Sequence, residues 1–230
     1  KYSIVVAQDV MTPMRDGLRL ASDVYRPAYN GDLAPGPFPT ILGRTSYDKT
    51  DPVAWIDHVA NFFTPRGYAV VLQDLRGRAR SDGTGEYLHA SNPSEGLDGY
   101  DTVEWIAAQP WSNGRVGTVG TSHGGIVQTA MALHRPPHLT AMWADVSPIN
   151  TYNYAREGGA MTLFMFGALL LHAHDAQELD GNPAGQHVIM EAMENLREVI
   201  LKMPFKPGHT PLAAVPNLEK MFFEYYYRGE

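Results

Sequence analysis

Apolar positions in the first 150 residues predict short strands that alternate with helices. Two β-like runs, 10–13 and 18–25, flank the Asp-Gly turn at 14–17 and predict an antiparallel hairpin. A Pro- and Gly-rich loop is expected over 27–39. Further strands are predicted at 40–43, 68–72, 116–121 and 139–146, and helices near 52–64, 98–108 and 126–134. This alternation predicts a parallel sheet with helices on both faces.

The pattern changes after Ser147, where strand-like segments stop. Helical stretches are predicted at about 155–172, 186–203 and 218–227, with no strand between them. The change predicts two regions, an α/β core over residues 1–147 and a helical region over residues 148–230.

Residues 116–125, Val-Gly-Thr-Val-Gly-Thr-Ser-His-Gly-Gly, join a buried strand to a Gly-x-Ser-x-Gly turn centred on Ser122. A helix follows, so the segment has the strand-turn-helix order of a nucleophile elbow rather than an ordinary Gly-rich turn. Gly120 and Gly124 leave room at a sharp turn where larger side chains would clash. Backbone N–H groups at a helix start stabilise a nearby oxyanion. The segment therefore predicts that Ser122 is a nucleophile.

Composition narrows the classes of function. The chain has 230 residues, 44% of them hydrophobic, which is enough for a sizeable core. Its net charge of -7 and its 18 scattered Lys and Arg residues argue against a nucleic-acid partner, because phosphate binding needs concentrated positive charge. The lack of cysteines excludes disulfides but leaves the compartment open. The longest apolar run, 163–171, is shorter than the ~20 residues of a membrane span, so no membrane anchor is expected.

Metal and nucleotide cofactors are not expected either. Histidines and carboxylates lack the close spacing of a metal site, and no Gly-rich phosphate-binding motif stands between a strand and a helix. Alternate arginines after a strand more often pair with carboxylates than bind an anion. Arg76, Arg78 and Arg80 are therefore expected to pair with carboxylates such as Asp74 or Asp82.

Four motifs, in order along the chain, resemble those of one family. They are 14–21 with 23–27, Arg44-Thr45-Ser46-Tyr47-Asp48-Lys49, Asp74-Leu75-Arg76-Gly77 with Ser81 and Gly83, and 109–117, which leads into the elbow. Over residues 10–150 the chain is similar to the cocaine esterase / X-Pro dipeptidyl-peptidase (CocE/NonD) family of serine hydrolases. The resemblance implies an α/β-hydrolase fold with a mostly parallel sheet. Residues 1–147 would be the N-terminal part of its core, and 148–230 the start of an apparently incomplete helical cap.

The resemblance also implies roles for individual residues. Ser122 matches the nucleophile that attacks an ester or amide carbonyl and forms an acyl-enzyme. Tyr47 matches an oxyanion-hole tyrosine, and the backbone N–H of His123 would be the second donor. The His123 side chain could line the pocket. The implied substrates are small: acyl esters, amino-acid esters, β-lactam side-chain amides or X-Pro dipeptides.

A serine nucleophile needs a base, normally a histidine oriented by an acid, and in α/β-hydrolases both follow the serine in the chain. The nine histidines offer no convincing base. His172, His174 and Asp175 end a helical stretch, where packing or solvated roles are expected. Asp145, at a strand end, is expected at a sheet edge or pocket wall.

We therefore expect the base and acid in sequence beyond residue 230 or on another chain. The chain, which begins at Lys1, would then be the N-terminal portion of a longer enzyme. A complementary polypeptide that completes the fold, a homo-oligomer and an inactive product are the alternatives. Alone, such a portion would expose an apolar sheet edge and be poorly stable.

Candidate substrate contacts lie after the elbow. Glu157 is the one carboxylate in a plausible cap-entry position, which is too little to predict selection of an ammonium substrate. Phe164 and Phe166 lie in an apolar run with helical spacing and are predicted as cap core, part of which could wall an acyl pocket. The alternative function is non-catalytic: a fragment or interaction scaffold that keeps the elbow and binds a partner through the exposed sheet edge.

Overall fold

The computed structural model describes all residues except 52–55, 85–92, 149, 151, 153–154 and 228–230. The chain divides into two compact units, residues 1–149 and residues 150–230. Each unit has its own core of buried hydrophobic side chains.

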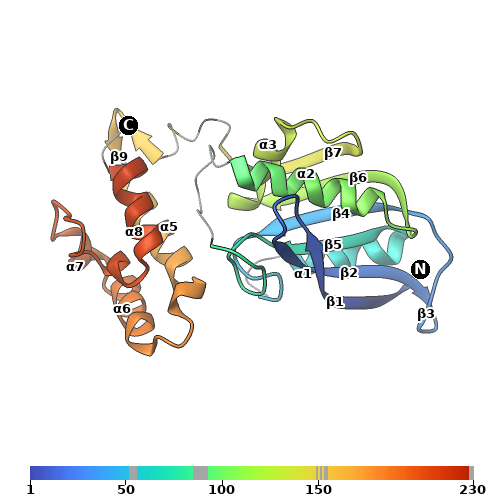
Figure 1. Cartoon of the computed structure of the whole chain (residues 1–230), viewed down its shortest axis with the longest axis horizontal. Coiled ribbons are helices and arrows are strands. Elements are labelled where there is room, and N and C mark those ends of the chain that lie inside the picture. Colours follow the sequence, from blue (N-terminus) through green and yellow to red (C-terminus); the bar gives the residue numbers. More distant parts are fainter. Residues whose placement is uncertain (52–55, 85–92, 149, 151, 153–154, 228–230) are drawn as a thin grey trace. The chain divides into compact units, whose positions relative to one another are not determined.

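The first unit is built on a mixed sheet (Figure 1). Its strands are β1 (Ser3–Pro13), β2 (Arg19–Tyr29), β3 (Asp32–Leu33), β4 (Phe38–Thr45), β5 (Ala69–Asp74), β6 (Ser112–Thr121) and β7 (Leu139–Asp145). The spatial order is β1-β2-β5-β4-β6-β7, with β3 paired to β2. The four strands from β5 to β7 are parallel, and β1 with β2 forms the predicted antiparallel hairpin. The β2–β5 pair is antiparallel. The part of the sheet from β5 to β7 is therefore parallel, as predicted, and the sheet as a whole is mixed.

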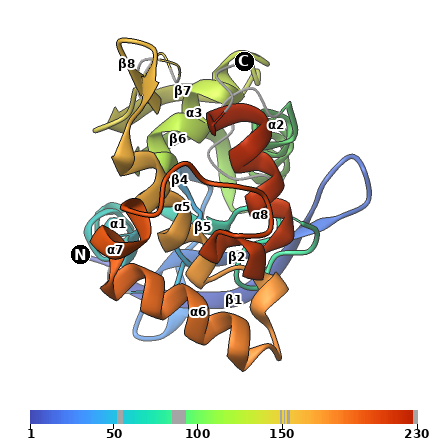
Figure 2. The same cartoon turned by 90° about the vertical axis from the view of Figure 1, so that its left-hand side faces the viewer.

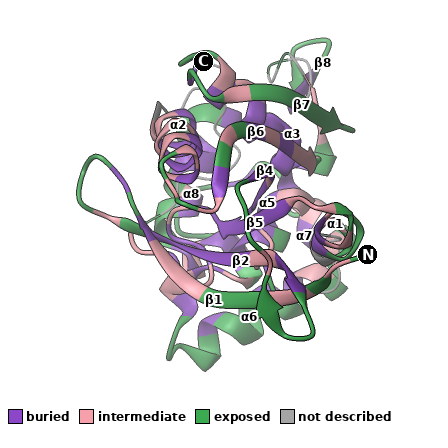
Figure 3. Ribbon diagram, turned by 90° about the vertical axis from the view of Figure 1, so that its right-hand side faces the viewer, coloured by how far each residue is buried: buried purple, intermediate pink, exposed green. Residues whose placement is uncertain are grey.

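Helices cover both faces of this sheet: α1 (Ile56–Phe63), α2 (Pro93–Ala107) and α3 (His123–Ala132). Successive side chains of a strand point to opposite faces. On β5, Val71 packs with Val103 of α2 and Met131 of α3, whereas Val70 and Leu72 pack with the α1 side. All six residues of β5 are consequently buried, and the strand is purple throughout in Figure 3. The predicted helix near 52–64 is found from Ile56, and its first positions lie outside the described residues.

The far edge of the sheet is exposed. From Thr140 to Asp145 every residue of β7 is exposed (green in Figure 3), and β6 is its ladder partner among the described strands. Trp143 is 71% exposed and Val146, directly after the strand, 76%. This is the apolar sheet edge that the sequence led us to expect.

The loop predicted over 27–39 is partly a strand, so that prediction was wrong in extent. β2 continues to Tyr29, and the short β3 pairs back onto it. The reversal occurs at Asn30 and Gly31, which have φ angles of 51° and 91°. An Asn-Gly pair tolerates this left-handed backbone and forms a tight hairpin turn. The turn chemistry was present in the sequence but was obscured by the surrounding prolines.

The second unit is mainly helical, and its helices are orange to red in Figure 2. Its elements are β8 (Arg156–Glu157), β9 (Ala160–Met161), α5 (Leu163–His174), a 3-10 turn (Gln177–Leu179), α6 (Pro183–Glu194), α7 (Leu196–Ile200), a second 3-10 turn (Pro211–Ala214), α8 (Pro216–Met221) and a π-helical turn (Phe222–Tyr227). Among the described residues, no helix is long and apolar enough to cross a membrane.

The prediction of a strand-free helix from residue 155 was wrong. β8 and β9 form an antiparallel hairpin, and the helix begins only at Leu163. The turn between the strands contains Gly158 and Gly159, with φ angles of 58° and 88°. Two adjacent glycines adopt positive φ without steric cost and therefore favour a two-residue hairpin turn.

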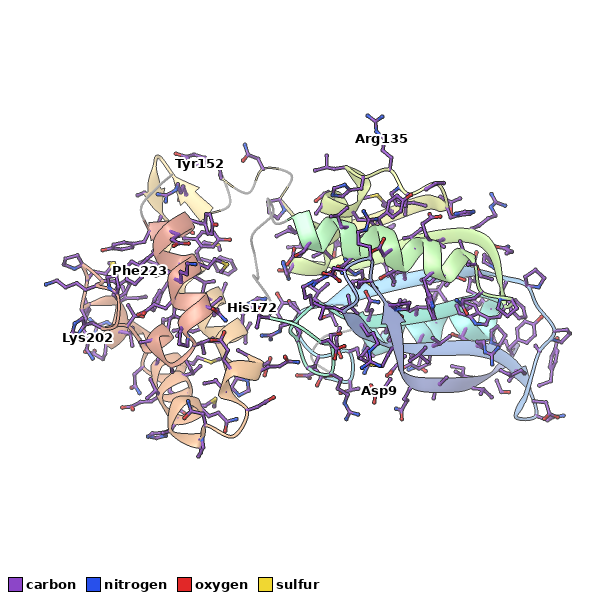
Figure 4. All side chains as sticks on the ribbon, viewed as in Figure 1. Asp9, Arg135, Tyr152, His172, Lys202 and Phe223 are labelled. Atoms are coloured by element: carbon purple, nitrogen blue, oxygen red, sulfur yellow. The ribbon has the colours of Figure 1, made fainter. Side chains whose placement is uncertain are left out.

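An aromatic cluster forms the centre of the second unit. The ring of Phe166 stacks on Phe205 with centroids 4.6 Å apart and meets the edge of Phe222 at 5.3 Å. Phe222 also contacts Phe223, which is labelled in Figure 4. Such pairs add to the hydrophobic stabilisation of a small core.

Candidate active site

Ser122 lies at the junction of β6 and α3. Its backbone has φ 56° and ψ -122°, a conformation rare for a residue with a side chain. Its N–H donates to the carbonyl oxygen of Asp145 at 3.0 Å, and its carbonyl accepts the N–H groups of Gly125 and Ile126. The side chain is half-buried. The strand, the strained turn and the helix start match the elbow geometry that the sequence predicts for Ser122.

Glycines at three positions make the elbow possible. A Cβ on Gly120 would lie 2.4 Å from the carbonyl oxygen of Gly124, and one on Gly124 would lie 3.1 Å from that of Arg44. A Cβ on Gly125 would lie 2.5 Å from the Cβ of Ser147. The sequence pattern identified the first two glycines, whereas the third depends on a contact with the loop after β7.

Tyr47 follows β4 by two residues, and Ser122 follows β6 by one. β4 and β6 are parallel neighbours with Gly43 opposite Val119, so both residues leave the sheet at the same edge. The Tyr47 N–H donates to Oγ1 of Thr45 at 3.0 Å, and the side chain is half-buried. The topology therefore brings the segments of the two predicted catalytic residues together.

The His123 side chain points into the protein interior. It has no exposed surface, and its Nδ1 lies 3.0 Å from the hydroxyl oxygen of Ser46. Its Nε2 faces Oε1 of Glu95 at 3.4 Å. The suggestion that this side chain lines a pocket was wrong, because the imidazole is enclosed between β4 and α2. The His123 N–H remains at the first position of α3, where an oxyanion donor is expected.

The segment carrying Tyr47 is fixed by charged groups. Nε of Arg78 donates to the Ser46 carbonyl oxygen at 2.6 Å, and the Lys49 N–H donates to Oδ1 of Asp74 at 2.7 Å. The Lys49 side chain is completely buried, and its ammonium lies 2.8 Å from Asp9 and 3.3 Å from Asp23. These contacts hold the segment at both ends.

Asp9 reaches Lys49 from a bulge in β1. The β1–β2 register shifts between Ala7 and Val10, and Asp9 has a φ of 51°. A bulge re-aims a side chain locally. Its carboxylate meets Lys49 at 2.8 Å and Arg80 at 2.6 Å; Figure 4 labels Asp9.

Burial and neighbouring charges have opposing effects on the pKa values of Asp74 and Lys49. Burial raises the pKa of Asp74 to about 6, against the lowering effect of the Lys49 N–H and ammonium. Burial lowers the pKa of Lys49, but the hydrogen bond that its ammonium donates to Asp9 and the charges of Asp74 and Asp23 raise it overall. The lysine is therefore charged, and the pKa of Asp74 lies well above that of an ordinary carboxyl group.

Arg76 and Arg80 in the loop after β5 pair with carboxylates, although the partners differ from those expected, whereas Arg78 donates to the Ser46 carbonyl oxygen. Arg76 contacts Asp98 and Asp16, each at 2.6 Å. Arg80 contacts Asp9. These pairs tie the loop after β5 to β1, to α2 and to the first hairpin turn.

The predicted substrate contacts all lie in the second unit. Glu157 is exposed in β8, and Phe164 is 62% exposed on α5. Phe166 has no exposed surface, because it forms the centre of the aromatic cluster. Packing accounts for Phe166, so we do not propose it as a substrate contact. For Glu157 and Phe164 a substrate contact stays a prediction.

The two histidines of α5 have other polar partners. Nδ1 of His172, labelled in Figure 4, meets the carbonyl oxygen of Ala168 one turn earlier in α5 at 2.8 Å. Nδ1 of His174 meets its neighbour Asp175 at 2.6 Å. Among the described residues, no group of three or more His, Cys, Asp or Glu side chains is arranged to hold a metal ion.

Comparison with known proteins relates the chain to hydrolases. The sequence model of the X-Pro dipeptidyl-peptidase (S15 family) matches residues 16–213. The cocaine esterase of a Rhodococcus species is 39% identical over 162 residues, which cover 69% of this chain and 27% of that protein. The Xaa-Pro dipeptidyl-peptidase of Ligilactobacillus salivarius is 30% identical over 114 residues, which cover 43% of this chain and 14% of that protein.

A solved structure has a similar fold. The CocE/NonD family hydrolase from Staphylococcus aureus is 28% identical with a TM-score of 0.63, over 74% of this chain and 32% of that one. The fold class predicted from the sequence is thereby confirmed. The chain spans about a quarter of the length of the cocaine esterase relative and about a third of the staphylococcal hydrolase.

Proposed function

Because the chain belongs to the X-Pro dipeptidyl-peptidase (S15) family, whose members are esterases and X-Pro dipeptidyl-peptidases, we propose that it hydrolyses small acyl esters or amides through an acyl-enzyme on Ser122. The family membership confirms the resemblance seen in the sequence. The observation that carries the proposal is the backbone of Ser122, held at φ 56° between β6 and α3. A serine in this conformation presents its hydroxyl at a helix N-terminus.

The chemistry would proceed in two steps. In the first, Oγ of Ser122 attacks the carbonyl carbon, its proton passes to a base, and the carbonyl oxygen becomes an oxyanion. The Tyr47 phenol and the His123 N–H would donate hydrogen bonds to that oxyanion. Collapse then breaks the bond to the leaving alcohol or amine, which takes the proton. In the second step, water attacks the acyl-enzyme and releases the acid and Ser122.

The base and its acid are expected in sequence beyond residue 230 or on another chain. Two observations support this part of the proposal. The chain spans 27% of the cocaine esterase relative, and the histidines of α5 have partners of their own. The exposed ladder edge of β7, next to the Ser122 strand, offers a place where further strands could complete the sheet.

General acyl-ester or amide hydrolysis is favoured over an aminopeptidase-like activity. An ammonium group of a substrate, once buried, needs a paired carboxylate. Glu157 is the one carboxylate in the second unit that the sequence suggested for this purpose, and it is exposed in a hairpin. The family includes esterases and X-Pro dipeptidyl-peptidases, so assays with both kinds of substrate must decide between the two activities.

The decisive experiment is intact-mass analysis of the native protein after reaction with a fluorophosphonate. We expect one adduct per active site, lost in Ser122→Ala. Ser112→Ala, at the opposite end of β6, is the matched control and should label like wild type. A protein that never labels, or an adduct that survives in Ser122→Ala, would contradict the proposal and favour the interaction scaffold.

A further inference from the structure

Three buried polar side chains form a row behind the elbow. Ser46 and His123 have no exposed surface, and Glu95 is 5% exposed. The Ser46 hydroxyl contacts Nδ1 of His123, whose Nε2 faces Glu95. Burying polar groups costs desolvation free energy, which their hydrogen bonds must offset. Apolar side chains of similar size would fill the same space without that cost. The row therefore calls for a role beyond packing.

The partners define how the imidazole is bonded. A carboxylate can only accept, so in the neutral ring Nε2 carries the hydrogen that points at Glu95. Nδ1 is then the acceptor, and the Ser46 hydroxyl donates to it. Nη1 of the buried Arg44 donates to the Glu95 carbonyl oxygen at 2.9 Å and fixes that residue from the other side.

The row links the two chain segments that carry the proposed oxyanion donors. Ser46 directly precedes Tyr47, and His123 is itself the residue whose N–H would be the second donor. Gly124, the next residue, packs so tightly on β4 that a Cβ there would lie 3.1 Å from the Arg44 carbonyl oxygen. The hydrogen bond therefore joins two backbone segments that are already in contact.

We propose that the His123 side chain is a positioning group that fixes the Tyr47 segment against the elbow through the Ser46 hydroxyl. This inference rests on the proposed function, because its purpose is to set the distance between the two oxyanion donors. Full burial keeps both the Ser46 and the His123 side chains away from substrate, so neither side chain is a catalytic group. A displacement of about 1 Å at such a site can lower the rate by on the order of 100-fold.

The kinetic test is a double-mutant cycle in the native protein with a small ester. Ser46→Ala and His123→Phe should each lower kcat about 10- to 100-fold and change KM less than about threefold. The double variant should be no slower than the slower single variant, because both changes remove the same hydrogen bond. Ser112→Ala, which removes a buried serine hydroxyl at the far end of β6, should leave kcat unchanged.

His123→Asn separates positioning from packing. Its amide places a polar atom near the position of Nδ1 and should recover most of the kcat lost in His123→Phe. A recovery in kcat at equal urea midpoints supports the proposal. Multiplicative effects in the cycle, or single variants within twofold of wild-type kcat, would overturn it.

Hydrogen exchange tests the link without requiring activity. Ser46→Ala should increase exchange of the amides around Tyr47 and also of those around His123, whereas Ser112→Ala should change neither. Exchange that rises in only one segment would overturn the proposed link. If wild type proves unreactive toward esters and the fluorophosphonate, the proposed function fails, and the exchange result still decides whether the two segments are joined.

Discussion

Lys49 binds one carboxylate with both ends of the residue. Its backbone N–H donates to Oδ1 of Asp74 at 2.7 Å, and its ammonium lies 3.6 Å from Oδ2. Neither side chain has exposed surface. The pairing ties the end of β5 to the segment that carries Tyr47, two residues before the lysine. Because the carboxyl group is buried, its ionisation is linked to folding.

Asp74→Asn should reveal this linkage. Burial raises the pKa of Asp74 from 3.8 to about 6, so the folded protein binds the proton more tightly than the unfolded chain. Ionisation of Asp74 therefore costs stability as the pH rises from about 4 to 6, and the full cost remains above that range. The free energy of unfolding of wild type minus that of Asp74→Asn should fall over this window, by at most about 1.4 kcal/mol per pH unit.

Urea unfolding of both proteins from pH 4 to pH 8 measures this difference. The pKa of Asp9 is lowered, mainly by the hydrogen bond from Lys49. Ionised Asp9 therefore stabilises the fold, and this contribution is lost as the pH falls below the ordinary pKa of an aspartate. That contribution is present in both proteins and cancels in the difference. A difference that rises with pH would show that the Asp74 pKa is lowered instead.

Gly120→Ala should be strongly destabilising. Its new Cβ would approach the Gly124 carbonyl oxygen to 2.4 Å, and backbone atoms of a sharp turn cannot move aside cheaply. Gly117→Ala, on the same strand, is the control, because its Cβ would meet the flexible end of Ile41 at 3.3 Å. We expect Gly120→Ala to cost about 3 kcal/mol or more and Gly117→Ala less than about 1.5 kcal/mol in chemical unfolding. Equal costs would contradict the tight elbow.

Replacement of Ser122 by glycine should separate activity from stability. Both Ser122→Gly and Ser122→Ala lose the nucleophile and should not react with a fluorophosphonate. At φ 56° and ψ -122° glycine avoids a steric cost that alanine retains. Ser122→Gly should therefore unfold at higher urea than Ser122→Ala, by on the order of 1 kcal/mol. An alanine variant of equal or greater stability would argue against the strained backbone.

Tyr47→Phe should affect turnover far more than stability. The change removes one hydroxyl from a half-buried ring. Loss of one oxyanion donor typically lowers kcat by about 100- to 1000-fold. Steady-state kinetics with a small ester, together with urea unfolding, would measure both effects. A variant with wild-type kcat would remove Tyr47 from the proposed oxyanion hole.

The elbow could be predicted because its signals are local. Two glycines, a serine, a preceding strand and a following helix all lie within 116–134, and each has a direct steric or hydrogen-bonding meaning. The order of the strands brings Tyr47 to the same edge, and only the family resemblance singled that tyrosine out among 12. The core strands were predictable for the same reason, since their apolar runs need both faces covered.

The groups behind the elbow could not be predicted in this way. Glu95 precedes His123 by 28 positions, and their contact arises only when α2 packs beside the β4–β6 pair. In the sequence Lys49 resembles an ordinary surface lysine. Its burial depends on the bulge in β1, which places the Asp9 carboxylate next to its ammonium. The β8–β9 hairpin was missed because its two strands are too short to show an alternating pattern of apolar and polar residues.

Truncation of Phe166 should destabilise the protein far more than truncation of Phe164. The two residues lie two positions apart on α5 and thus point to different sides of the helix. Phe166→Ala should cost about 3–5 kcal/mol in the unfolding of the second unit, because it empties the centre of the aromatic cluster.

Phe164→Ala should cost less than about 1 kcal/mol, because that ring is 62% exposed. If Phe164 lines an acyl pocket, its truncation should instead raise KM for esters with long acyl groups and leave KM for acetyl esters unchanged. An unchanged KM across the acyl series would remove Phe164 from the substrate site. A small stability loss in Phe166→Ala would contradict its place in the core.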